Sequence, residues 1–171
     1  YANIAKYMPE IPVHLIGEVS PLTLVKRLKK IVGANINLII DGKGYFIDPK
    51  IKDNLVRNGN WLAALCIFPY SVQYLNTEPT KFFDYMSYGI PIICSNFPVW
   101  KDFIDKEKCG LTVNPDDIND IKDKINYLLN NIEVGVTMGE NGRKAVLEKY
   151  NWNTEEIKLL QLYNNITGTN R

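Results

Sequence analysis

The chain has 171 residues, of which 46% are apolar and 23% are charged, the composition of a folded domain with a core of its own. Its net charge of +1 argues against a nucleic-acid surface, which carries a clustered basic excess. Since no run of about 18 apolar residues occurs, we expect no membrane-spanning segment. Cys66, Cys94 and Cys109 lie in or beside apolar runs without metal-ligand spacing. They predict reduced core thiols of a cytoplasmic protein and no metal site.

The first third of the chain alternates between helical and extended patterns. The chain begins with apolar residues at helical spacing, Tyr1, Ile4, Ala5 and Met8. No capping residue precedes them, so the segment resembles the middle of a helix. The elements expected next are a strand at Val13–Gly17, a helix at Leu22–Val32, a strand at Ile36–Ile40 and a helix at Pro49–Asn58.

The alternation continues and then gives way to helices. We expect a buried strand within Leu62–Pro69, a polar stretch at Tyr70–Thr77, a helix between Pro79 and Gly89, a strand at Ile90–Cys94 followed by a turn, a strand at Gly110–Val113, and helices over 118–132, 137–149 and 154–166. Strands that alternate with helices predict an α/β fold, in which helices cover both faces of a parallel sheet.

The helix between Pro79 and Gly89 has two different faces. Phe82, Phe83 and Met86 fall on one side, while Lys81 and Asp84 fall on the other. A lysine in the first turn opposes the helix dipole unless an anion lies there, because backbone N–H groups and the lysine then converge on it. The spacing leaves two interpretations open: a phosphate site with a neighbouring carboxylate for ribose hydroxyls, or an i,i+3 surface ion pair.

The residues around this helix resemble the donor-binding signature of retaining glycosyltransferases of family 4 (glycosyl transferases group 1). The helix begins Pro-Thr-Lys and continues Phe-Phe-Asp-Tyr-Met, and further pieces follow in the family's order and spacing. These pieces are Ser-Asn-Phe-Pro-Val-Trp at 95–100, Cys-Gly-Leu-Thr-Val-Asn-Pro at 109–115, Met-Gly-Glu-Asn-Gly-Arg at 138–143 and Tyr-Asn-Trp at 150–152.

The resemblance implies the C-terminal, donor-binding half of a two-domain GT-B enzyme. Residues 1–171 would form a single nucleotide-sugar-binding domain, a Rossmann-like three-layer αβα unit. Its first strand would precede Tyr1 and is missing here, so we expect a fragment that is inactive alone. The C-terminal helix, 153–167, would pack toward the absent N-terminal domain.

The resemblance also implies the substrates. The donor would be a UDP- or GDP-linked sugar, bound without a cofactor or metal. The acceptor, a glycan or lipid-linked saccharide in polysaccharide biosynthesis, would be bound through the N-terminal domain. The expected location is cytoplasmic, at the inner face of the membrane, with peripheral association of the full-length protein.

Site roles carry over by position. Asp84 would hold the donor ribose, Thr80 and Lys81 the phosphates, and Asn76 the donor sugar; the family prefers glutamate at both acidic positions, 76 and 84. The loop of Gly44, Tyr45, Phe46 and Ile47 would contact the nucleobase. No catalytic residue is assigned within the fragment.

Other conspicuous residues have simpler interpretations. His14 is expected on a sheet face, Asp41-Gly42-Lys43-Gly44 forms a turn rather than a dinucleotide fingerprint, and Asp116 and Asp117 begin a helix. Trp100 and Trp152 are expected to be packing anchors, and Arg143 to be solvated. Two other functions stay open: a non-catalytic nucleotide-binding or partner module, and a GT-B sugar-nucleotide epimerase.

Overall fold

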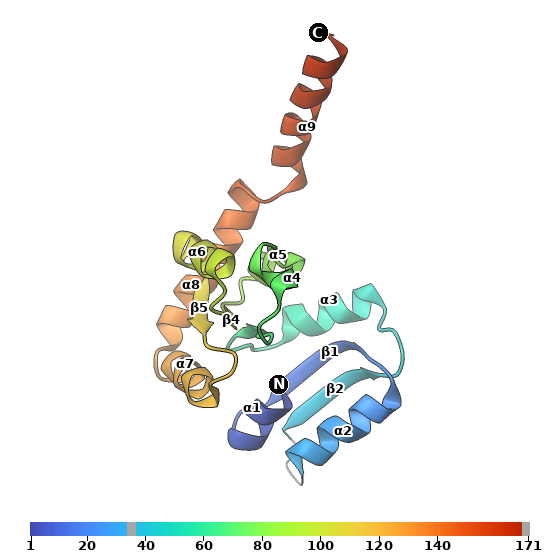
Figure 1. Ribbon diagram of the computed structural model, residues 1–171, viewed down its shortest axis with the longest axis vertical. Coiled ribbons are helices and arrows are strands. Elements are labelled where there is room, and N and C mark those ends of the chain that lie inside the picture. The colour runs from blue at the N-terminus through green and yellow to red at the C-terminus, as the bar shows by residue number, and fades with distance from the viewer. Residues whose placement is uncertain (34–36, 169–171) are drawn as a thin grey trace.

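The computed structural model describes residues 1–33 and 37–168. Helices and parallel strands alternate through the first two thirds of the chain, and helices alone complete it (Figure 1). The predicted α/β class with parallel strands is therefore confirmed.

The strands form two sheets. In the first, β1 (Val13–Val19) pairs in parallel with β2 (Leu38–Lys43). In the second, β4 (Ile92–Ser95) lies between β3 (Ala64–Cys66) and β5 (Gly110–Val113), again in parallel. In a Rossmann order of 3-2-1-4-5-6, the break between the sheets falls where the first strand would stand. The described strands thus match that order on either side of the break.

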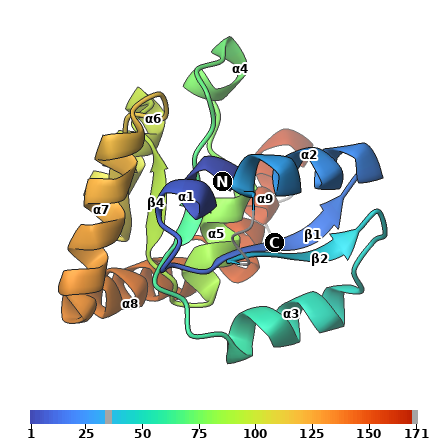
Figure 2. The same cartoon turned by 90° about the horizontal axis from the view of Figure 1, so that it is seen from below.

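Nine helices are found among the described residues. They are α1 (Ala2–Tyr7), α2 (Leu22–Val32), α3 (Pro49–Asn58), α4 (Val72–Leu75), α5 (Thr80–Ser87), α6 (Pro98–Glu107), α7 (Ile118–Asn130), α8 (Ile132–Glu148) and α9 (Trp152–Thr167). Figure 2 shows α2 and α3 on opposite faces of the β1–β2 sheet. This is the layering that parallel strands with helical crossovers require.

Several elements differ from the expectation. The stretch at 70–77 contains the one-turn helix α4, and the turn expected after β4 is the start of α6. Pro98 occupies the first turn of α6, where a missing N–H costs nothing, so it begins a helix rather than breaking one. The expected strand within 62–69 is shorter, α8 begins earlier than predicted, and Ile36 lies outside the described residues.

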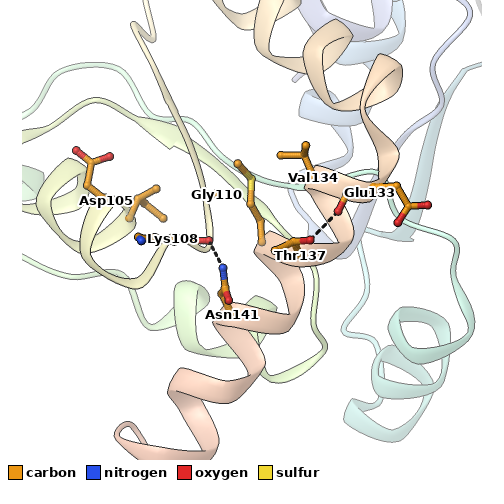
Figure 3. Close-up of a pocket in the computed structure, with 9 residues that line it drawn as sticks. Asp105, Lys108, Gly110, Glu133, Val134, Thr137 and Asn141 are labelled. Carbon is orange, nitrogen blue, oxygen red and sulfur yellow. Dashed lines mark hydrogen bonds between the residues drawn. The ribbon is translucent and has the colours of Figure 1, made fainter.

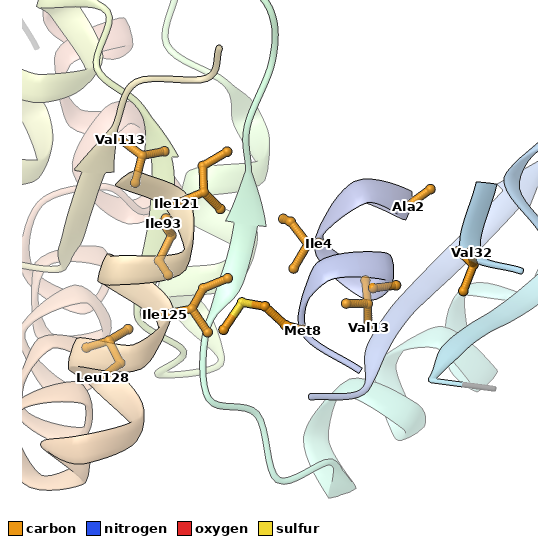
Figure 4. Close-up of a cluster of buried hydrophobic side chains, with 11 residues drawn as sticks. Ala2, Ile4, Met8, Val13, Val32, Ile93, Val113, Ile121, Ile125 and Leu128 are labelled. Atoms are coloured by element: carbon orange, nitrogen blue, oxygen red, sulfur yellow. The ribbon is translucent and has the colours of Figure 1, made fainter. Parts of the chain in front are cut away.

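A continuous apolar cluster joins the two sheets. Ile4 and Met8 of α1 point toward Ile93 of β4 and Ile125 of α7 (Figure 4). Asn37 fixes the turn after α1, because its Nδ2 donates to the carbonyl oxygens of Ala5, Met8 and Ile11 at 2.8–3.2 Å. The first helix therefore packs between the two sheets as their common core.

Helices α5 and α8 approach closely because α8 carries glycines on the contact side. A Cβ at Gly139 would lie 2.0 Å from the carbonyl oxygen of Gly89. Gly89 itself has φ 71°, the left-handed geometry that suits the residue just after a helix, as predicted for it. The turn that ends α5 is thus in direct backbone contact with α8.

A buried carboxylate ties α6 to the end of α8. The Glu107 side chain is 3% exposed, and its Oε2 lies 2.7 Å from Nζ of Lys149. Its Oε1 accepts a hydrogen bond from the Tyr150 hydroxyl at 2.8 Å. Burial alone would raise the pKa of this carboxyl, but the bonds from Lys149 and Tyr150 outweigh burial and hold the pKa below its usual value.

Helix α9 extends away from the rest of the molecule (Figure 1). None of its residues is buried, and Ile157, Leu160 and Ile166 are all more than half exposed. Trp152 is 66% exposed, so the expectation that it is a packing anchor is wrong, whereas Trp100 is fully buried. The expected contact of this helix with another domain stays a prediction.

Candidate functional site

The N-terminus of α5 has the two faces that the sequence predicted. Phe82 and Met86 are fully buried, while Lys81 and Asp84 are exposed. Pro79 occupies the cap position without a side-chain cap bond, and the first turn holds no acidic residue. The amides of Thr80 and Lys81 therefore begin a helix whose first turn has neither a side-chain cap nor a carboxylate of its own.

Thr80 and Lys81 line a small pocket of about 160 Å³. The remaining lining residues are Phe68, Tyr74, Thr77, Pro79 and Trp100. Nζ of Lys81 lies 5.8 Å from the centre of the Phe68 ring, within cation–π range. The two predicted phosphate-binding residues thus lie together beside an aromatic wall.

The pocket lies at the carboxyl ends of β3 and β4, and Ser95 fixes these ends to each other. Its Oγ accepts from the Phe68 amide at 2.9 Å and donates to the Phe68 carbonyl at 2.8 Å. Trp100 Nε1 donates to the Thr77 carbonyl at 2.5 Å and so anchors the segment that leads into α5. In open α/β sheets, ligands bind at these carboxyl ends.

The predicted ribose and sugar residues lie outside the pocket lining. Oδ2 of Asp84 is 3.9 Å from Nζ of Lys52 on α3, and both side chains are largely exposed. The alternative of a Lys81–Asp84 ion pair is not found among the described residues. Asn76 ends α4 and is exposed.

The predicted nucleobase loop lies beside the β1–β2 sheet. The Gly44 amide donates to the Val19 carbonyl at 3.0 Å, and a Cβ on Gly44 would lie 2.8 Å from the Leu22 side chain. Tyr45 and Phe46 are exposed at 60% and 73%, while Ile47 is buried. The structure thus leaves the aromatic side chains of the loop free for a ligand, in the opposite half of the chain from α5.

Most of the simpler interpretations hold, but the turn expected at 41–44 is wrong, because Asp41, Gly42 and Lys43 continue β2 in parallel pairing with β1. His14 lies on a sheet face, where Nε2 is 2.5 Å from Oδ2 of Asp41 on the neighbouring strand. Asp117 caps α7 by accepting from the amides of Asn119 and Asp120, and Arg143 is exposed.

All three cysteines are free and buried, as expected. Burial raises the pKa of the Cys66 thiol to about 11 and that of Cys109 to about 12, so these thiols are protonated at neutral pH.

A larger depression of about 660 Å³ lies at the opposite end of the second sheet (Figure 3). Gly110, the first residue of β5, is part of its lining, together with Lys108 and residues of α6 and α8. There, Asn141 donates to the Lys108 carbonyl at 3.2 Å. This depression is at the amino end of β5, so it is separate from the pocket at α5.

Searches for two other kinds of site were negative within the described residues. No group of three or more His, Cys, Asp or Glu side chains is arranged to hold a metal ion. No helix in residues 1–33 and 37–168 combines the length and apolarity needed to cross a bilayer.

Comparison with known proteins adds three findings. The family described as glycosyl transferases group 1 matches residues 9–145. A poly(ribitol-phosphate) alpha-N-acetylglucosaminyltransferase of Staphylococcus aureus (strain COL) is 36% identical over 63 residues, which are 37% of this chain and 13% of that protein. Sucrose-phosphate synthase from Thermosynechococcus elongatus shares the fold with a TM-score of 0.74 and 22% identity, over 98% of this chain and 42% of that one. The chain therefore spans less than half the length of either relative.

Proposed function

The chain belongs to the glycosyl transferases group 1, and on that premise we propose that it binds the donor of a retaining, metal-independent glycosyltransferase. The enzyme would transfer a hexosyl group from a nucleotide diphosphate sugar to a glycan or lipid-linked acceptor. The observation that supports this most directly is the uncapped start of α5, which brings Thr80 and Lys81 into one pocket at the carboxyl ends of two strands.

The pocket offers what a diphosphate leaving group needs. Free amides at a helix N-terminus carry a partial positive charge, and Lys81 adds a full one. Lys81 has no ion-pair partner among the described residues, so its charge is available to an anion. Stabilising the negative charge that develops on the leaving diphosphate favours transfer of the sugar without a metal ion.

The other contacts in this proposal surround the pocket. Asp84 lies one turn further along α5, where its carboxylate would accept hydrogen bonds from ribose hydroxyls. Asn76 would bond the donor sugar, and the backbone of residues 44–47 would meet the base. Because the only ion pair of Asp84 among the described residues is with Lys52 at 3.9 Å, few interactions compete with a ribose for its oxygens.

A further domain of the full-length protein would supply the acceptor site. This chain alone would therefore not catalyse sugar transfer. The S. aureus relative is named for a poly(ribitol-phosphate) acceptor, which supports a role in polysaccharide or cell-surface polymer synthesis. The three buried, free thiols support a cytoplasmic location, which we place at the inner face of the membrane.

The test is calorimetric titration of UDP, GDP and their sugars into the full-length protein. One nucleotide series should bind, and Lys81→Gln should weaken it roughly 10- to 100-fold, the effect of losing one charge-assisted contact. Lys144→Gln on α8 is the control and should bind normally, since Lys144 lies away from the pocket and is 4.0 Å from Glu148 on its own helix. If no nucleotide binds at millimolar concentration, or if both variants bind alike, the proposed site is wrong.

A second titration tests the proposed contact between Asp84 and the ribose. The protein should prefer the ribonucleotide over its 2′-deoxy counterpart, and Asp84→Ala should abolish that preference, because the carboxylate would no longer meet the ribose hydroxyls. A preference that survives the substitution would remove Asp84 from the ribose site.

A further inference from the structure

Helix α2 carries a concentrated positive charge on the outside of the first sheet. Four of the chain's 20 lysines and arginines, Lys26, Arg27, Lys29 and Lys30, lie on this helix, which contains none of its 19 carboxylates. All four side chains are exposed. The net charge of the whole chain is close to zero, but the outer surface of α2 is strongly cationic.

These cations are unpaired, whereas five of the ten lysines on the other described helices form an ion pair. Lys101, Lys144 and Lys158 each have a carboxylate three or four residues away on their own helix. None of the four α2 cations has an ion pair or side-chain hydrogen bond within the described residues. An ordinary solvated helix face would mix the two charge signs, as α6, α8 and α9 do.

The charges face away from the protein. At 100° per residue the four cations span an arc of about 160°, opposite Val25 and Val32, which are buried against the sheet. Figure 2 shows α2 on the outer side of β1 and β2, with α3 on the other face. The whole cationic arc is thus free to meet a flat partner.

An apolar side chain accompanies the charge. Leu22 lies within the cationic arc and is 57% exposed. A soluble polyanion or nucleic acid would satisfy the cations but would leave this leucine in water. A membrane surface satisfies both, because phosphate head groups meet the cations while the leucine reaches the boundary of the acyl chains.

We propose that the outer face of α2 is a docking surface for an anionic lipid membrane. A cation near such a surface contributes enough attraction to change partitioning about fivefold, so four together give a strong but reversible association. The attraction is screened by salt, since the contact is exposed. This surface is separate from the pocket at α5.

The experiment measures sedimentation of the full-length protein with vesicles of phosphatidylcholine alone or mixed with phosphatidylglycerol. Wild-type protein should bind the mixed vesicles and lose binding as salt is raised. The triple variant Lys26→Gln, Lys29→Gln, Lys30→Gln should bind roughly 100-fold less. The matched control removes three paired lysines, 101, 144 and 158, with the same change in net charge and should bind nearly as well as wild type.

Two further measurements separate the alternatives. Leu22→Ser should also reduce vesicle binding, and circular dichroism should show that both variants are folded. The lipid proposal is overturned if the α2 and control triples bind alike. It is also overturned if the leucine variant binds vesicles normally while a soluble polyphosphate competes fully, because the surface would then recognise a polyanion.

Discussion

The buried carboxylate of Glu107 gives the sharpest stability test in the molecule. Glu107→Ala removes the acceptor of two bonds, from Lys149 at 2.7 Å and from the Tyr150 hydroxyl at 2.8 Å. These bonds join the end of α6 to the end of α8, two segments far apart in sequence. The substitution therefore removes a buried polar link between these two helices.

The magnitude follows from the exposure of the partners. Hydrogen bonds to charged groups each contribute about 1.5–3 kcal/mol. The Lys149 side chain is 51% exposed and regains water when Glu107 is lost, which favours the lower end of the range. We expect a loss of about 3 kcal/mol in the free energy of unfolding, or roughly 6–12 °C in Tm for a chain of this size.

The assay is urea unfolding followed by tryptophan fluorescence, since Trp100 on α6 is fully buried. Glu148→Ala is the matched control: its carboxylate is exposed and lies 4.0 Å from Lys144, so the loss should be under about 1 kcal/mol. If the two alanine variants unfold at the same urea concentration, the buried cluster does not stabilise the fold as argued.

The same cluster predicts a dependence on pH. The folded pKa of Glu107 is depressed, so its contribution is complete above the ordinary carboxyl value of 4.5 and is lost as the pH falls through the folded pKa. The stability difference between wild type and Glu107→Gln should therefore shrink as the solution is acidified below about 4.5. A difference that stays constant with pH would contradict the assignment of an ionised carboxylate.

Two other substitutions test packing and capping. Gly139→Ala would place a Cβ 2.0 Å from the Gly89 carbonyl oxygen and should cost about 1–3 kcal/mol in thermal unfolding. Gly135→Ala on the same helix meets nothing closer than 3.8 Å and should stabilise by up to about 1 kcal/mol, so a shared sign would refute the close approach. Asp117→Ala removes the cap of α7 and should cost about 1 kcal/mol, whereas Asp116→Ala should cost less; equal losses would contradict the cap.

Local patterns predicted the elements that are amphipathic and have clear ends. The bounds of α2, α3 and β5 agree with the expectation, because an apolar stripe and a boundary residue such as Pro49 or Gly110 coincide there. Helix α4 was missed because its single turn depends on distant aromatic contacts. Tyr74 stacks on the Phe97 ring with the centroids 6.4 Å apart, and no local signal records this.

The candidate site, too, could be predicted only where local sequence patterns indicate it. Thr80 and Lys81 were found from the start signal of one helix, a local feature. The aromatic wall of Phe68 and Tyr74 and the clasp of Ser95 come from three separate elements, so only the fold brings them to Lys81. The buried role of Glu107 could not be predicted from the local sequence, because its hydrogen-bond partners Lys149 and Tyr150 are 42 and 43 residues away.

The break between the two sheets has a mechanical consequence. Among the described residues no backbone hydrogen bond links β1 to β3, and side chains make three polar links across the break. These are Tyr1 to the Leu65 carbonyl, Tyr88 to Asp53, and Lys52 to Asp84. The loop of residues 44–47 belongs to one sheet and Thr80 and Lys81 to the other, so a small shear in the shared apolar cluster would change the span between the proposed base and phosphate contacts. The length of nucleotide that fits the proposed site would thereby depend on side-chain packing rather than on a rigid backbone ladder.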